Sequence, residues 1–160
     1  MIIANNEYRK LPVGIQSFNV IREEGYLYVD KTDMIWKWAN QGFKYNYLSR
    51  PRRFGKSVLI DTLQAYFEGR KDLFEGLKIM ELEKDWKQYP VIRLDMSRGG
   101  ATANEVKAYL DRTFDVYEQL YGIHIKPTDS LGNRFDLIIK TAYKQTGANV
   151  AILIDEYDSP

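Results

Sequence analysis

The chain has 160 residues, enough for about one domain, and 44% of them are hydrophobic, so a core can form. An aromatic content of 14% argues against intrinsic disorder, and a formal net charge of +1 argues against a surface coated with positive charge for nucleic acid. The absence of cysteine excludes disulfides and thiolate metal sites.

The N-terminus, "MIIANNEYRK", lacks the apolar run of a secretory signal. No stretch of the sequence approaches the roughly 18 apolar residues that a membrane-spanning helix needs. We therefore expect a cytoplasmic protein that has no membrane partner.

Residues 1–42 are expected to form an N-terminal segment that leads into the core. Tyr26 and Tyr28 alternate with other residues, which predicts a short strand. Asp30 or Thr32 is expected to cap the helix that follows.

The segment "FKYNYLS", residues 43–49, is rich in aromatic residues and predicts a strand. A loop then leads to an amphipathic helix that starts after Lys56 and stops near Gly69. The apolar face of this helix follows the i, i+4, i+7, i+8 spacing, with Leu59, Leu63, Tyr66 and Phe67.

The second half of the chain alternates predicted strands and helices. "PVIRLDM" predicts a strand that ends near Asp95, and we expect this carboxylate to cap the next turn, a share in a metal site being the alternative. Thr102 and Glu105 form a T-x-x-E capping box at the start of a helix that ends at Gly122. A further helix is predicted over residues 131–145.

Near the end of the chain, "VAILI" is a wholly apolar run of the kind expected of a strand buried on both faces. Strands separated by helices imply an α/β fold with parallel crossovers.

One loop between the predicted strand 43–49 and its helix resembles a phosphate-binding loop. The P-loop pattern is G-x-x-x-x-G-K-[ST], in which the backbone cradles phosphates, the lysine reaches the β- and γ-phosphates and the hydroxyl binds Mg²⁺. Gly55 allows close approach of the backbone, and the helix N-terminus adds oriented N–H donors. Arg50 replaces the first glycine. The nucleotide-binding residues predicted by this match are Arg50, Pro51, Arg52, Arg53, Phe54, Gly55, Lys56 and Ser57.

The apolar run near the end of the chain stops at two adjacent carboxylates, as in a Walker B motif. Asp155 is expected to hold Mg²⁺, and Glu156 is expected to act as general base on a water. The plain alternative is a strand followed by a polar turn. Because ligands of parallel sheets bind at the carboxyl ends of the strands, we expect Ser57 and Asp155 to meet around one metal ion.

The chain resembles the AAA-ATPase-like family, whose members often carry a PD-(D/E)XK nuclease domain after the ATPase module. The matching phrases are "GIQSFNVIREEGYLYVDKT", "YLSRPRRFGKSVLIDTLQAYFEGRKDLFEGL", "LGNRFDLII" and "ILIDEYDSP". The family itself carries R-P-R-R-F-G-K-S, so Arg50 is no local defect.

The resemblance implies a P-loop NTPase fold, a three-layer α/β/α sandwich with a mainly parallel sheet, and ATP and Mg²⁺ as cofactors. It implies Lys56 and Glu156 as catalytic residues, with Ser57 and Asp155 as metal ligands. The implied partners are the C-terminal domain of the parent chain, a nuclease in many members, and nucleic acid through that domain.

The resemblance also implies the strand order 5-1-4-3-2, in which strand 4 follows the Walker B strand along the chain. Because the sequence stops at Pro160, we expect residues 43–160 to be a partial core, truncated after the Walker B strand. We therefore expect ATP turnover only in the full-length parent.

Three other functions stay open from the residues alone. One is a nucleotide-bound switch with little turnover, and another is a small-molecule kinase, in which G-K-S also occurs. Alternatively, the arginine-rich loop binds backbone phosphates of a nucleic acid. Arg52 or Arg53 is a candidate for neutralising charge in a transition state, the alternative being solvent exposure or an acidic neighbour.

Overall fold

The computed structural model describes residues 2–4, 7–42, 44–49, 51, 54–126 and 129–157. The chain divides into two compact units, residues 1–87 and residues 88–160, and each is described by itself. The protein is mixed α/β, and its only parallel sheet within the described residues has two strands.

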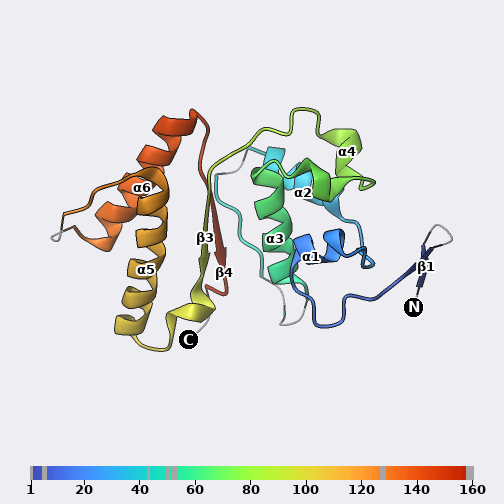
Figure 1. Cartoon of the computed structure of the whole chain (residues 1–160), viewed down its shortest axis with the longest axis horizontal. Coiled ribbons are helices and arrows are strands. Elements are labelled where there is room, and N and C mark those ends of the chain that lie inside the picture. Colours follow the sequence, from blue (N-terminus) through green and yellow to red (C-terminus); the bar gives the residue numbers. More distant parts are fainter. Residues whose placement is uncertain are drawn as a thin grey trace. The chain divides into compact units, whose positions relative to one another are not determined.

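The N-terminal unit is mainly helical, with one antiparallel hairpin at its start (Figure 1). Its elements are β1 (Ile2–Ala4), β2 (Glu7–Arg9), α1 (Phe18–Glu23), α2 (Thr32–Asn40), α3 (Lys56–Phe67), the 3-10 turn η1 (Lys71–Phe74) and α4 (Ile79–Leu82).

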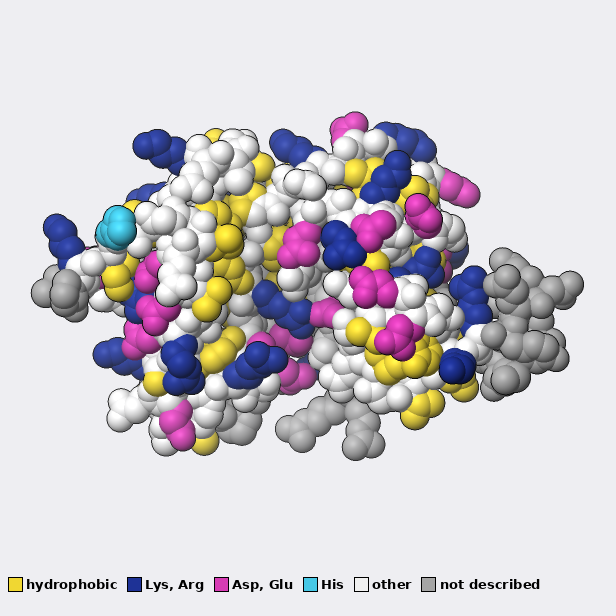
Figure 2. Space-filling model, viewed as in Figure 1, with side chains coloured by type: hydrophobic (Ala, Val, Ile, Leu, Met, Phe, Trp, Pro, Cys, Tyr) yellow, Lys and Arg dark blue, Asp and Glu magenta, His cyan; other side chains and the backbone are white. Residues whose placement is uncertain are grey.

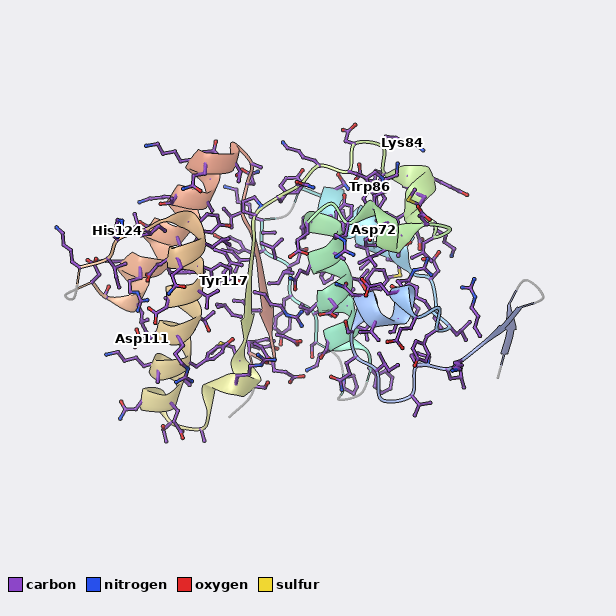
Figure 3. All side chains as sticks on the ribbon, viewed as in Figure 1. Asp72, Lys84, Trp86, Asp111, Tyr117 and His124 are labelled. Carbon is purple, nitrogen blue, oxygen red and sulfur yellow. The ribbon has the colours of Figure 1, made fainter. Side chains whose placement is uncertain are left out.

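Aromatic rings form the core of the N-terminal unit. The ring of Phe74 is fully buried and lies 5.1 Å from the ring of Phe18 and 5.2 Å from that of Trp86, measured between centroids. Tyr66 on α3 adds its ring 6.1 Å from Trp86 and donates its hydroxyl to Glu83 at 2.6 Å. Figure 3 marks Trp86 in this unit. These contacts hold the C-terminal half of α3 and leave its first turn outside the aromatic cluster.

One carboxylate joins α2 to α4. Asp30 accepts hydrogen bonds from the backbone nitrogen of Thr32 at 2.9 Å and from that of Lys78 at 2.8 Å. The Thr32 hydroxyl, in turn, accepts from the backbone nitrogen of Ile79 at 3.0 Å. Burial alone would raise the pKa of Asp30, but the hydrogen bonds from Thr32 and Lys78 outweigh it and hold the pKa below its ordinary value. The expectation that Asp30 or Thr32 caps this helix is wrong as stated, because Lys31 is the N-cap residue and no side chain caps from there, whereas Asp30 binds the backbone nitrogen of Thr32, the first helical residue, from one position further back.

Two strands predicted for this unit are wrong. Residues 26–30 and 44–49 have no strand conformation, and Phe43 lies outside the described residues. Tyr45 and Tyr47 are 93% and 70% exposed. Aromatic alternation favours a strand only when a neighbouring strand pairs with the segment, and the described sheets pair β1 with β2 and β3 with β4, without these segments.

The C-terminal unit places two long helices on one side of the parallel strand pair (Figure 1). The pairing runs from Val91↔Ala151 to Asp95↔Asp155, so both strands end at the same level. Its elements are β3 (Val91–Asp95), the 3-10 turn η2 (Met96–Gly99), α5 (Ala103–Tyr121), α6 (Leu131–Thr146) and β4 (Ala151–Asp155).

The predicted strands and helices of this unit are confirmed. The capping box forms, because Thr102 accepts from the backbone nitrogen of Glu105 while the Glu105 carboxylate accepts from that of Thr102. Gly122 ends α5 in a left-handed conformation. The core under both helices consists of Ile92, Leu94, Phe114 and Ile138.

The expectation that the last strand is buried on both faces is wrong. Leu153 is 7% exposed, whereas Ile152 and Ile154 are 40% and 47% exposed. By register, these isoleucines share a face with Ile92 and Leu94 of β3, over which α5 and α6 form the core cluster. The helices therefore cover β3 more fully than β4.

Tyrosine hydroxyls from α5 satisfy the outer edge of β3. In a parallel ladder, successive residues direct their N–H groups to opposite sides of the strand. The backbone nitrogen of Arg93 donates to the hydroxyl of Tyr117 at 2.8 Å, and that of Asp95 donates to the hydroxyl of Tyr109 at 2.7 Å. Figure 3 shows Tyr117 extending from α5 toward β3. The edge of β3 away from β4 is thus already hydrogen-bonded.

An ion cluster around the buried Arg134–Glu118 pair fastens α6 to α5. Arg134 on α6 donates to Glu118 at 2.8 Å, to Asp111 at 2.7 Å and to Asp115 at 2.8 Å, all three on α5. The hydrogen bond to Glu118 is the main cause that raises the pKa of Arg134. Three carboxylates around one guanidinium fix how the two helices cross.

Across the described ranges, no helix is both long enough and apolar enough to cross a bilayer.

Candidate functional site

One group of candidate residues lies at the start of α3, in the N-terminal unit. Gly55 is the N-cap residue, with φ 73° and ψ 25°, and its carbonyl accepts from the backbone nitrogen of Leu59 at 3.0 Å. This left-handed backbone conformation is itself a reason for glycine at position 55. The close approach of a phosphate, expected from the sequence, is a second reason. Lys56 and Ser57 are the first two residues of the helix, and both are partly buried.

The N-terminus of α3 has the features of an anion site. The first N–H groups of any α-helix have no partner within the helix and point along its axis with the positive end of the helix dipole. In α3, the N-cap residue is a glycine and therefore supplies no capping side chain, and no acidic residue lies in the first turn. A helix of 12 residues that begins in this way can bind a phosphate group.

The remaining residues of the predicted phosphate loop are only partly described. Pro51 and Phe54 are exposed, Phe54 by 65%. Arg50, Arg52 and Arg53 lie outside the described residues, so their predicted contacts with phosphate remain predictions.

Another group of candidate residues lies at the carboxyl end of β4, in the C-terminal unit. Asp155 is the last residue of the strand and is 6% exposed. Its Oδ1 accepts from the backbone nitrogen of Glu156 at 3.0 Å. Glu156 has φ 49°, a left-handed conformation that is costly for a residue with a side chain. The strand therefore ends sharply between the two acids, whose backbone conformations differ.

Asp95 ends β3 beside Asp155, in the same register. Its Oδ1 accepts from the nitrogen and the hydroxyl of Ser97, at 3.2 and 2.6 Å, and its Oδ2 lies 3.1 Å from Nε of Arg98. The expectation that Asp95 caps the following turn is confirmed. With these three partners, its carboxylate is already engaged.

Arg93 is a residue near the site that the sequence reasoning missed. Its Nη2 lies 4.0 Å from Oδ2 of Asp155, across the two strands. The signal was present in the sequence, because arginine at the third position of a five-residue apolar strand is rare without an acidic partner. The partner could be identified only once the register of the two strands was known.

The oxygen donors fit Mg²⁺ better than a metal that needs a full protein cage. Mg²⁺ is commonly held by one or two protein oxygens, together with phosphates and water. Within the described ranges, no cluster of three or more His, Cys, Asp or Glu side chains could hold a metal by itself. A buried carboxylate at a strand end and a hydroxyl at a helix start suit an ion that arrives with a polyphosphate.

The structure brings together the predicted residues within each unit. Lys56 and Ser57 lie side by side at the start of α3 in the N-terminal unit, and Asp155 and Glu156 lie at the end of β4 in the C-terminal unit. The meeting of Ser57 and Asp155 at one ion stays a prediction.

Charges of both signs are interspersed on the visible surface of each unit (Figure 2).

A family model and one known protein each match most of the chain. The family model described as "Predicted AAA-ATPase" matches residues 12–160. A protein of Azotobacter chroococcum mcd 1, named "Uncharacterized protein in vnfD 5'region", is 39% identical over 155 residues, which make up 95% of this chain and 30% of that relative. The chain thus spans less than a third of the relative's length. No solved structure matches the chain.

Proposed function

The chain belongs to the Predicted AAA-ATPase family, and on that premise we propose that it is the Mg²⁺-dependent ATP-binding and ATP-hydrolysing module of a larger protein. Family membership supports nucleotide binding. The observation that carries the proposal is the start of α3, where a left-handed glycine is followed directly by a lysine and a serine. This geometry fits a P-loop helix, in which the backbone faces the phosphates.

Phosphate binding is assigned to the loop before α3 and to the first turn of that helix. The N–H groups at the helix start donate to phosphate oxygens, and Gly55 leaves room for them. Lys56 neutralises charge on the β- and γ-phosphates. The proposal extends to the loop residues predicted from the sequence, Arg50, Pro51, Arg52, Arg53 and Phe54.

Metal binding and catalysis are assigned to both units. The Ser57 hydroxyl and the Asp155 carboxylate hold Mg²⁺, which, when bound, draws electron density from the γ-phosphate oxygens. Glu156 takes a proton from the attacking water as the water oxygen bonds to the γ-phosphorus and the bond to the ADP oxygen breaks. The separate backbone directions of Asp155 and Glu156 support this division of roles.

We propose that ATP binding and hydrolysis by this module gate or drive a partner domain. We assign residues 43–160 to the ATPase core and residues 1–42 to a segment that leads into it. The greater length of the Azotobacter relative supports a further domain in such proteins. A nuclease is the candidate for that domain, with nucleic acid as its substrate.

Titration of the full-length protein with Mg-ATP tests the binding proposal. Lys56→Ala should weaken binding at least about tenfold, because a lysine–phosphate contact worth about 1.4 kcal/mol corresponds to that factor. Lys71→Ala, which removes an exposed lysine of the same unit, is the matched control and should bind as the wild type does. Equal affinity of Lys56→Ala and wild type would remove the assignment.

Hydrolysis is tested separately from binding. Glu156→Gln should keep the affinity for Mg-ATP and lower the rate of phosphate release by about 10²-fold or more, the usual worth of a general base. Equal rates would leave a nucleotide-bound switch as the better description.

A further inference from the structure

Arg93 occupies a position that the proposed function leaves unexplained. It lies in the middle of β3, where Ile92 and Leu94 on either side point into the helix-covered core. Because side chains alternate along a strand, Arg93 projects from the opposite face, together with Asp155 of the neighbouring strand. The Arg93 side chain is 28% exposed and that of Asp155 is 7% exposed.

The two carboxylates at the strand ends have different arginines. Asp95 pairs with Arg98, three residues further along the chain, and the Arg98 side chain is 76% exposed. Asp155 instead has Arg93 at 4.0 Å, across the strand pair and largely shielded from water. Arg98 is thus a local surface partner, whereas Arg93 is a cross-strand partner of the residue assigned to the metal.

A guanidinium at this distance has two opposite effects on a metal site. It attracts the buried carboxylate of Asp155 while no metal is present. It also repels a divalent cation that approaches the same oxygen, and the repulsion is stronger in a shielded site than in water. Phosphate groups that arrive with the metal would offset the positive charge of Arg93.

We propose that Arg93 is a positioning residue that holds Asp155 in the metal-free protein and weakens binding of free Mg²⁺, so that the metal enters together with ATP. This inference rests on the proposed function, since it requires Asp155 to be a metal ligand. It assigns to Arg93 control over the order in which metal and nucleotide bind. In the absence of nucleotide, the positive charge of Arg93 disfavours binding of Mg²⁺ at the Asp155 carboxylate.

Mn²⁺ binding to the full-length protein tests the inference, with free Mn²⁺ followed by electron paramagnetic resonance. Without nucleotide, Arg93→Gln should bind Mn²⁺ more tightly than the wild type, on the order of tenfold, because the repelling charge is gone. Arg93→Met, which keeps the apolar stem, should show the same gain if Arg93→Gln does not fold. Arg93→Lys keeps the charge and should stay close to wild type.

Two controls identify the source of the gain. Arg98→Gln removes the arginine of Asp95 and should leave Mn²⁺ binding unchanged. Asp155→Asn combined with Arg93→Gln should abolish the gain, because the new affinity depends on the Asp155 carboxylate. A purely structural role of Arg93 would weaken metal binding and would not strengthen it.

The outcomes separate the inference from the function beneath it. If the wild type binds Mn-ATP but neither neutral variant gains affinity for free Mn²⁺, the inference is overturned and the proposed function stands. If the wild type fails to bind Mn-ATP, the proposed function fails and the role of Arg93 fails with it.

Discussion

The guanidinium of Arg134 and the carboxylate of Glu118 lie 2.8 Å apart, and the two side chains are each only 7% exposed. They link the start of α6 to the last third of α5, and Asp111 and Asp115 complete the cluster from the solvent side. Asp111 is labelled on α5 in Figure 3. The pair holds the helices that cover β3, and thereby supports the strand pair that ends at Asp95 and Asp155.

Arg134→Met should destabilise the protein by about 3 kcal/mol, because it leaves a buried carboxylate without its counter-ion. Chemical denaturation measures the change. Lys140→Met, which breaks the exposed pair between Lys140 and Asp136, is the control and should cost less than about 1 kcal/mol. Adding Glu118→Leu to Arg134→Met should recover most of the loss, since a buried ion pair replaced by apolar groups is often neutral. Equal costs for Arg134→Met and the control would show that the cluster is not effectively buried.

Tyr117→Phe should cost about 1 kcal/mol of stability, because the backbone N–H of Arg93 loses its acceptor. Amide hydrogen exchange provides the specific measurement, and the amide of Arg93 should exchange faster while that of Leu94, which faces β4, keeps its protection. Tyr143→Phe removes a hydroxyl from an exposed ring and is the control. Unchanged exchange at Arg93 would argue that this hydroxyl does not seal the strand edge.

Gly55→Ala should lower stability by about 1–2 kcal/mol, the usual cost of placing a side chain at a left-handed position. Gly147→Ala is a matched control, because Gly147 has φ 67° and open space around its Cα, as Gly55 does. The two variants should lose similar stability in thermal unfolding. Only Gly55→Ala should also weaken Mg-ATP binding, about tenfold or more, because its new methyl group would face the phosphates of the proposed site. If both variants lost ATP affinity equally, the loss in Gly55→Ala would come from general destabilisation and not from a contact with phosphate.

Asp30→Asn should make the stability of the N-terminal unit less sensitive to a fall in pH. The pKa of Asp30 is held below its ordinary value of 3.8, so its ionised form stabilises the folded state. That contribution is complete above the unfolded pKa and is lost as the pH falls through the lower folded pKa. The wild type should therefore be more stable than Asp30→Asn near neutral pH, and the difference should shrink below about pH 3.8. A difference that stays constant down to pH 2 would contradict the role of the Asp30 charge.

The sequence allowed good prediction wherever a local signal coincided with a buried face. The capping box of Thr102 and Glu105 and the left-handed end at Gly122 define α5 because both act within one or two turns. The helix after Gly55 was equally clear from its apolar spacing. The sharp turn between Asp155 and Glu156 was expected only as a strand end, and its left-handed backbone came from the structure.

Features that depend on distant partners could not be predicted. Residues 44–49 carry an aromatic alternation typical of a strand, but a strand also needs a paired neighbour. Arg93 and Tyr117 are 24 residues apart, and their hydrogen bond follows only from the packing of α5 on β3. The pairing of Arg134 with Glu118 similarly required the crossing of two helices to be known.

The central claim is that Ser57 and Asp155 share one metal ion on the bound nucleotide. A double-mutant cycle on Mn²⁺ affinity in the presence of ATP, with Ser57→Ala, Asp155→Asn and both together in the full-length protein, tests it most directly. We predict that each single change weakens Mn²⁺ binding about tenfold or more, and that the combined loss is smaller than the product of the two because the ligands are coupled through the ion. Full multiplicative losses, or an unchanged affinity in Asp155→Asn, would contradict a shared site.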